Sequence, residues 1–418
     1  MKVAIIGGGS TYTPEVMEGL ALWQLDGGVD AVSLYDTDEK RLATVGDFSR
    51  RMALALNTSL QVETCATFEQ AIEGADFVVL QIRVGGQQAR HEDILMGLKH
   101  GLIGQETTGV GGFAKALRTI PVVLEMARQV RDANPEAWIV NFTNPAGIVT
   151  EAICRFATTR CVGLCNVPKE FQMDVARHMR VASDEVELDW VGLNHLGWAR
   201  RIIIDGQDVL PYLIDSLESD YGPKNIPELE YPDGFLKALG MIPSSYVRYF
   251  YAQDQMLKEI LKKDKTRAQE VMDIEAELMA YYGDKSNSLK PAALTERGGA
   301  WYSRVAVEVM EALCSEKPAK LIVNALNHSA LDSLPGDACV EVPSEVSKDG
   351  VRPLPVGEVQ DSIMGLIWQV KAYERLAIDA AVSEDPGKAL LALVNHPLVP
   401  SSFVARKVLE DLQTRRLI

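Results

Sequence analysis

The 418-residue sequence contains no long hydrophobic run, although 47% of its residues are hydrophobic. No apolar stretch approaches the roughly 20 residues that a helix needs to cross a bilayer. The first residues, Met1–Ile6, have the pattern of a buried strand that leads directly into glycines, which is unlike a secretory signal. We therefore expect a cytoplasmic protein without a membrane partner.

An excess of positive charge and a framework of cysteines are also lacking. Lysine and arginine number 42 against 58 acidic residues, which gives a formal net charge of −16. Such a surface repels nucleic acid, so we expect no nucleic-acid partner, whereas buried arginines can still bind a small anion. The six cysteines are scattered along the chain, which favours free thiols over disulfides.

Short β-branched runs alternate with helical patterns in the first half of the chain. Five runs are predicted as buried strands: Val3–Gly8, Ala31–Tyr35, Phe77–Ile82, Trp138–Thr143 and Cys161–Asn166. Strands and helices in alternation predict an α/β fold built on a doubly wound, Rossmann-type parallel sheet with helices on both faces.

A turn of small residues follows the first predicted strand and precedes a helical segment. Its members are Gly7, Gly8, Gly9, Ser10 and Thr11. Glycines at this place let backbone N–H groups approach a pyrophosphate, although Tyr12 replaces the third glycine of the usual motif. Asp36 ends the second strand, where a carboxylate binds the ribose hydroxyls of NAD and repels the extra phosphate of NADP. We therefore predict that these five residues and Asp36 bind NAD.

The pattern changes after Val186. We predict strands at Val186–Val191 and Ala199–Ile204, helices over 253–282 and 357–384, and loops with short strands over Leu334–Pro355. No Ser/Gly-rich linker divides the chain. This favours a dinucleotide-binding domain at residues 1–170 and a tightly packed α+β substrate domain at 171–418, the last part of which is helical.

Polar side chains follow several predicted strands. Arg83 and Arg90 come after the Phe77 strand, Asn144 follows the Trp138 strand, and Glu106 lies in a glycine-rich loop. In open α/β sheets, ligands bind at the carboxyl ends of the strands, and stability does not explain so many polar groups at this edge.

Cys165 ends another predicted strand, and His195 follows thirty residues later. Either residue by itself could be an ordinary part of the core. A thiolate and an imidazole together suit a divalent transition metal. The polar groups at the neighbouring strand ends favour this second interpretation.

These motifs give the chain a resemblance to glycoside hydrolase family 4, the NAD- and metal-dependent glycosidases. The resemblance runs from Val3 to about Ser401, and its motifs occur in a consistent order. They are IIGGGSTYTP (5–14), RVGGQQAR (83–90), GLIGQETTGVGG (101–112), NFTNPAG (141–147), GLCNVP (163–168), GLNH (192–195), RGGAWY (297–302) and NHPLVPS (395–401). The implied fold is similar to that of lactate and malate dehydrogenases.

The resemblance implies a role for each matching position. Cys165 and His195 would bind the divalent metal, usually Mn²⁺, and Tyr246 would be the catalytic base, with Tyr249 or Tyr251 as alternatives. The substrate-binding residues would be Arg90 and Asn144 at the sugar, Asn166 beside the metal-binding cysteine, and Arg297 at a phosphate. The family also implies a homodimer or a homotetramer.

The Cys-Asn-Val-Pro form of the motif at Cys165 resembles the members of the family that act on 6-phospho-β-glucosides, whereas α-specific phospho-enzymes carry Asp at the position of Asn166. We therefore predict hydrolysis of such a β-glucoside to glucose 6-phosphate and an aglycone. The implied route is oxidation at carbon 3, removal of the carbon-2 proton, elimination, addition of water and reduction, with the metal as Lewis acid.

Two other functions are compatible with an NAD-binding fold. An NAD-dependent 2-hydroxy acid dehydrogenase would produce NADH in step with its product. A non-catalytic NAD sensor would leave Cys165, His195 and the arginines without a purpose.

Overall fold

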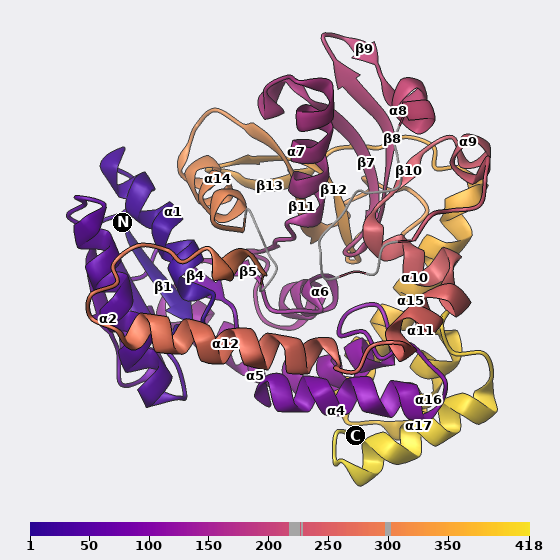
Figure 1. The fold of residues 1–418 in the computed structure, drawn as a ribbon, viewed down its shortest axis with the longest axis horizontal. Helices are drawn as coiled ribbons and strands as arrows, with labels where there is room; N and C mark the ends of the chain where they lie inside the picture. The colour runs from indigo at the N-terminus through magenta and orange to yellow at the C-terminus, as the bar shows by residue number, and fades with distance from the viewer. Residues whose placement is uncertain (217–225, 227–228, 297–301) are drawn as a thin grey trace.

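The computed structural model describes residues 1–216, 226, 229–296 and 302–418. A nine-stranded sheet of order β13-β12-β11-β6-β5-β4-β1-β2-β3 forms its centre (Figure 1). The strands are β1 (Lys2–Ile6), β2 (Ala31–Tyr35), β3 (Gln61–Thr64), β4 (Phe77–Leu80), β5 (Trp138–Asn141), β6 (Cys161–Gly163), β11 (Ala319–Leu326), β12 (Cys339–Ser347) and β13 (Gly350–Pro353). The strands β1 to β6 run parallel in the order 3-2-1-4-5-6, which confirms the predicted Rossmann-type sheet.

Strands from the second half of the chain complete this sheet. β11 pairs antiparallel with β6 and β12, and β13 pairs antiparallel with β12. The prediction of loops and short strands over Leu334–Pro355 was wrong for β12, a single strand of nine residues. Pro343 lies inside this strand, opposite Ile322 of β11, although proline usually argues against a strand with neighbours on both sides. Strands from both sides of residue 170 therefore belong to one sheet, and the domain boundary predicted at that residue stays a prediction.

Helices cover both faces of the sheet because side chains alternate along each buried strand. Val3 and Ile5 face one helical layer, and Ala4 and Ile6 face the other. The first layer contains α1 (Thr13–Leu25), α2 (Glu39–Ala55), α12 (Arg267–Gly283) and α14 (Tyr302–Cys314). The second contains α3 (Phe68–Ile72), α5 (Val110–Ala133) and α6 (Ala146–Phe156).

A smaller antiparallel sheet packs beside β12. Its strands are β7 (Glu187–Leu193), β8 (Leu196–Ile204), β9 (Gln207–Asp208) and β10 (Ile242–Pro243). The helix α7 (Val167–Met179) contacts β7, and Trp190 and Trp198 are fully buried in this region. The strands predicted over Val186–Val191 and Ala199–Ile204 correspond to β7 and β8.

The remaining helices lie around the two sheets (Figure 1). They are α4 (Gly86–Lys99), α8 (Leu210–Ser216), α9 (Phe235–Leu239), α10 (Arg248–Tyr251), α11 (Gln253–Leu261), α13 (Ala293–Glu296), α15 (Asp361–Ser383), α16 (Pro386–Asn395) and α17 (Ser402–Thr414), with 3-10 turns at Ser183–Glu185 and Ser245–Val247. Among the described helices, none has both the length and the apolar character that a membrane crossing requires.

Several elements were not predicted, and two of them, β3 and α4, have sequences that lack an apolar pattern. The edge strand β3 reads Gln-Val-Glu-Thr and is largely exposed. The helix α4 turns polar side chains inward, since Gln87, Arg90 and Asp93 are buried. An inner face of this kind has no apolar periodicity from which a helix can be predicted.

A buried ionic cluster joins α6 to α15. The fully buried Lys371 lies 2.8 Å from Glu151 and 2.5 Å from Glu374. Burial by itself lowers the pKa of Lys371, but the two carboxylates outweigh it and raise that pKa above the ordinary value. The lysine is therefore charged in the folded protein, and Glu151 and Glu374 share its single positive charge.

We expect Lys371→Met to destabilise the protein by roughly 3 kcal/mol, because the change leaves buried carboxylates without their main counter-charge. A shift in thermal unfolding temperature measures the effect. Lys320→Met is the matched control, since its salt bridge to Glu187 is solvent-exposed and contributes little. Equal unfolding temperatures for the two variants would contradict the assigned role of the cluster.

Candidate active site

The turn after β1 is shaped by Gly7, whose φ is +90°. The N–H groups of Gly7 and Gly8 both donate to the Tyr35 carbonyl, at 2.9 and 2.8 Å. A Cβ on Gly7 would lie 2.7 Å from the Gln81 carbonyl oxygen, so both the backbone conformation and the available space require glycine. The chain can thus pass close to a bound group before α1 begins at Thr13.

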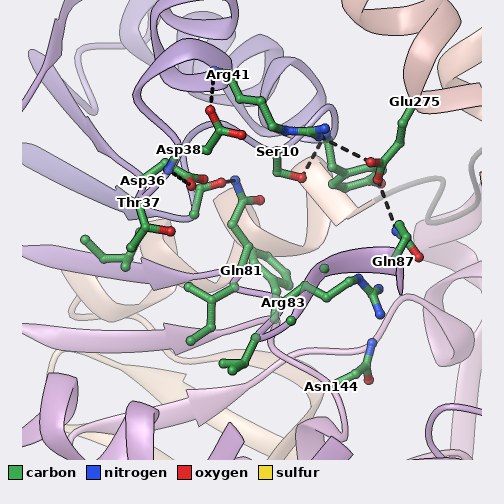
Figure 2. A pocket seen from close by; sticks show the side chains of 18 of the residues that line it. Ser10, Asp36, Thr37, Asp38, Arg41, Gln81, Arg83, Gln87, Asn144 and Glu275 are labelled. Carbon is green, nitrogen blue, oxygen red and sulfur yellow. Dashed lines mark hydrogen bonds and ion pairs between the residues drawn. The ribbon is translucent and has the colours of Figure 1, made fainter. Parts of the chain in front are cut away.

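Asp36 lies directly after β2, beside this turn. Its carboxylate accepts hydrogen bonds from the N–H groups of Gly9, at 2.9 Å, and Asp38, at 3.0 Å. Gly7, Ser10 and Asp36 line a cleft of about 860 Å³ that continues past Gln81 to Asn144 (Figure 2). The glycine turn, the acidic end of β2 and the cleft together fit a dinucleotide.

The other three residues predicted at the cofactor have different surroundings. Gly8 and Gly9 belong to the turn but are absent from the cleft lining, and Thr11 is fully buried. The Thr11 carbonyl accepts a hydrogen bond of 2.8 Å from the Tyr282 hydroxyl of α12. These positions support the turn, and direct contact with a cofactor stays a prediction for them.

The cleft is also lined by α12, a contribution that the sequence did not suggest. Glu275 forms an ion pair of 3.3 Å with Arg41 of α2 and accepts a hydrogen bond of 3.1 Å from Gln87 of α4. Figure 2 shows these three side chains meeting at the cleft. They lie up to 234 positions apart in the chain, so no local motif could have identified them.

We expect Gly7→Ala to weaken NAD⁺ binding by about tenfold or more, because a Cβ would strain the turn and displace the β4 end. Isothermal titration with NAD⁺ measures the effect. Gly27→Ala is the control, since Gly27 also has a positive φ, of 78°, but a Cβ there would meet open space. If the Gly7 variant bound NAD⁺ as tightly as the control, the turn would have no part in cofactor binding.

Beyond the glycine turn, Glu106 lies among three cationic side chains. Its carboxylate forms ion pairs with Arg83, with Arg90 at 2.9 Å and with Lys115 at 2.9 Å. Arg83, Arg90 and Glu106 were noted from the sequence, whereas Lys115 of α5 was missed because it lies within an apolar helical pattern. The cluster carries a net positive charge, which suits an anionic ligand.

Burial and mutual charge perturb each member of this cluster. Burial raises the pKa of Glu106, but the three cations outweigh it and hold that pKa well below the usual range. Burial, together with the charge of Arg83, lowers the pKa of Lys115 to about 7. Burial also lowers the pKa of Arg90 to about 10. Perturbed groups gathered at a cleft are typical of a functional site.

Cys165 and His195 come together through Asn194. The Asn194 side chain hydrogen-bonds to the Cys165 sulfur, and His195 is the next residue, in the turn between β7 and β8 with φ of +60°. Burial, reinforced by Glu341, raises the pKa of the Cys165 thiol well above its ordinary range. A metal would therefore have to displace the thiol proton.

The imidazole of His195 is suited to a metal. Burial is the main cause that lowers its pKa to about 3, so the ring is neutral at physiological pH. Its Nδ1 is buried and has no hydrogen-bond partner in the described part of the chain. Among the described residues, no group of three or more His, Cys, Asp or Glu could hold a metal, so an ion at Cys165 and His195 would take further ligands from water or substrate.

Tyr246 lies against this imidazole. The two rings stack at a centroid distance of 3.7 Å with an interplanar angle of 9°. Tyr249 is 3% exposed, and burial raises its pKa. Tyr251 packs against Trp198, Tyr231 and Phe235, and its pKa is likewise raised by burial. All three tyrosines are packed among other rings, and the assignment of Tyr246 as the base stays a prediction.

The predicted substrate-binding residues are distributed unevenly. Asn144 lines the cleft at the end of β5, below Arg83 in Figure 2. Arg90 lies in the Glu106 cluster. Asn166 is 6% exposed and directly precedes α7, where its amide donates a hydrogen bond of 3.4 Å to Glu170. Arg297 lies outside the described residues, and its predicted role stays a prediction.

Electrostatic interactions join the parts into one site. His195 interacts with Glu106 and Lys115, and Arg90 interacts with Tyr246. Tyr302, which lines the cleft, interacts with Cys165, Tyr246 and Glu106. The dinucleotide cleft, the cationic cluster and the thiol–imidazole pair are thus neighbours, and together with the sheet they define an NAD-binding type of enzyme fold.

Comparisons with known proteins agree with this arrangement. The model of the family 4 glycosyl hydrolases matches residues 2–181, and that of the family 4 glycosyl hydrolase C-terminal domain matches residues 190–399. A probable 6-phospho-beta-glucosidase of Bacillus subtilis is 40% identical over 99% of this chain and 95% of its own. A structure of the 6-phospho-beta-glucosidase of Thermotoga maritima with manganese, NAD⁺ and glucose-6-phosphate is similar at a TM-score of 0.91, with 36% identity, and covers 100% of this chain and 99% of that one.

The chain therefore belongs to glycosyl hydrolase family 4, and it is a glycosidase. The resemblance noted in its motifs is confirmed. The malate dehydrogenase of Plasmodium falciparum, 14% identical over 92% of this chain and 99% of its own, has a TM-score of 0.54, and this likeness concerns the fold alone.

Proposed function

We propose that this protein hydrolyses 6-phospho-β-glucosides to glucose 6-phosphate and an aglycone, with NAD and a divalent metal, Mn²⁺ in the first place, as cofactors. One observation carries the proposal. Lys115 and Tyr302 line the dinucleotide cleft, and the same two residues interact with His195, Cys165 and Tyr246. The cofactor and the thiol–imidazole pair can therefore act on one sugar.

When bound, NAD⁺ supplies reversible oxidation of a sugar hydroxyl, and the divalent metal supplies Lewis-acid polarisation of sugar oxygens. Cys165, as thiolate, and the neutral His195 hold the metal. Gly7, Ser10 and Asp36 hold the dinucleotide. Two of these residues fit their group on direct observation, since the buried Nδ1 of His195 has no hydrogen-bond partner among the described residues and a Cβ on Gly7 would fill the turn.

The chain's own residues then bind and deprotonate the sugar. Asn144 and Arg90 orient it, and the ion pair with Glu106 fixes the guanidinium of Arg90. Tyr246 Oη accepts the proton from carbon 2, and this tyrosine interacts electrostatically with Arg90. Asn166 cannot donate a proton as an acid, which suits a β-linked leaving group. Arg297 is assigned to the 6-phosphate.

The test is turnover of an aryl 6-phospho-β-glucoside by protein stripped of metal and nucleotide. We expect activity only when NAD⁺ and Mn²⁺ are both restored, no accumulation of NADH, and little activity on the matching α-glucoside. Turnover that persisted after both were removed would contradict the proposal. NADH formed in step with the oxidation of a 2-hydroxy acid to its 2-oxo acid would favour the dehydrogenase instead.

We further propose a homodimer or homotetramer in the cytoplasm, where a charged sugar phosphate is retained. One side of α15 is buried within the chain, whereas large apolar side chains are exposed on α15 itself, such as Trp368, and on the neighbouring helices. Phe403 of α17 is 81% exposed, and Leu391 of α16 is 53% exposed. Side chains of this kind are enriched at interfaces between subunits. Analytical ultracentrifugation would measure the assembly.

A further inference from the structure

Glu341 is a buried carboxylate that the proposed reaction does not use. It lies on β12 and is 1% exposed. Its oxygens accept hydrogen bonds from Trp190 Nε1 at 3.3 Å, Asn194 Nδ2 at 3.2 Å and Asn324 Nδ2 at 3.0 Å. All three donors are neutral, and among the residues that the structure describes none forms an ion pair with it.

This carboxylate is connected to both proposed metal ligands. Asn194 donates a hydrogen bond to Glu341 Oε1. Its side chain also hydrogen-bonds to the Cys165 sulfur, and it directly precedes His195 in the chain. Glu341 also interacts electrostatically with Cys165 itself. The position of the His195 ring depends on the Asn194–His195 turn, because His195 has a left-handed backbone with φ of +60°.

Stability alone does not account for an acid at this place. A buried carboxylate surrounded only by neutral donors is costly, and an amide of the same shape would be less so. The acid becomes favourable when a divalent cation binds next to it. In metal sites, carboxylates one step behind the ligands orient those ligands and strengthen binding.

We propose that Glu341 is a positioning residue for the divalent metal. It holds the Asn194 amide, and through it the Cys165 sulfur and the His195 turn, in the arrangement that receives the ion, and it adds negative charge beside a dication. This inference rests on the metal site of the proposed function. It adds a residue from β12, a strand outside the two motifs that contain the ligands.

The experiment measures binding of Mn²⁺ alone to the metal-stripped full chain, from the electron paramagnetic resonance signal of free Mn²⁺. We expect Glu341→Gln to bind Mn²⁺ about 10- to 100-fold more weakly than the wild type. Trp190→Phe is the matched control, because Trp190 bonds the other carboxylate oxygen and has no link to Asn194. This control should change the affinity by less than about threefold.

The following outcomes are decisive. Wild-type affinity in Glu341→Gln, or an equal loss in Trp190→Phe, would overturn the role of Glu341. Equal Mn²⁺ binding by the wild type and Cys165→Ser would instead overturn the metal site itself. Unfolding temperature and NAD⁺ affinity check the fold of each variant. If Glu341→Gln does not fold, the experiment uses Glu341→Asp, because the shorter side chain cannot bridge Asn194 and Trp190. Unchanged Mn²⁺ affinity in Glu341→Asp would also overturn the proposal.

Discussion

Replacement of Tyr246 by phenylalanine is expected to lower kcat by about 10²- to 10⁴-fold, the usual effect of losing a general base. The phenyl ring can keep the stacking of Tyr246 on His195, so only the hydroxyl is tested. Substrate deuterated at carbon 2 provides a direct measurement. The wild type should release the label to solvent, and the variant should retain it.

The neighbouring tyrosines supply the controls for this prediction. Tyr249 and Tyr251 are held in aromatic packing, and burial raises the pKa of each. Tyr249→Phe and Tyr251→Phe should therefore release the label almost as fast as the wild type. Continued label release by Tyr246→Phe, or its loss in Tyr249→Phe, would move the base to another residue.

Cys165→Ser is expected to weaken Mn²⁺ binding by more than about 100-fold and to remove metal-dependent turnover. This loss exceeds the effect expected from removing a residue that contacts the ligands but not the metal. A serine hydroxyl does not ionise near neutral pH, so the site loses its anionic, soft ligand. Binding of Mn²⁺ and activity against added Mn²⁺ are the two measurements.

Cys161→Ser is a close control for this experiment. Cys161 begins β6 four residues earlier, is also buried, and has a thiol pKa that burial raises. Its side chain belongs to the core behind the sheet, among the residues that pack on α5 and α6. Equal effects of the two substitutions on Mn²⁺ binding would mean that Cys165 is only a structural residue.

The inner face of α4 illustrates why part of the site was hidden from the sequence. Arg90 was identified from a motif, but the helix that carries it was not, because its inward side chains are polar. Lys115 was missed for the opposite reason, since it sits among apolar neighbours on α5. In both cases the partner that explains the residue, Glu106, lies on a different segment.

Other features of the fold could be predicted from the sequence because they depend on neighbouring residues. The glycine turn, the acidic end of β2 and the strands β1, β2, β4, β5 and β6 depend on residues close together in the chain. β2 was predicted with its observed bounds, Ala31–Tyr35. Parallel strands bring their carboxyl ends to one edge, so Asn144 and Cys165 could be placed near each other before any coordinates.

By itself, therefore, the sequence determined the Rossmann-type half of the sheet and the family, and it supplied the candidate residues for the chemistry. The tertiary structure alone decided which distant groups lie near these candidates: Glu275, which pairs with Arg41 at the cleft, and Glu341, which interacts with Cys165. The antiparallel pairing of β11 and β12 brings Glu341 there. Pairing of distant strands depends on the packing of the whole core, whereas a turn or a buried strand depends on a few adjacent side chains.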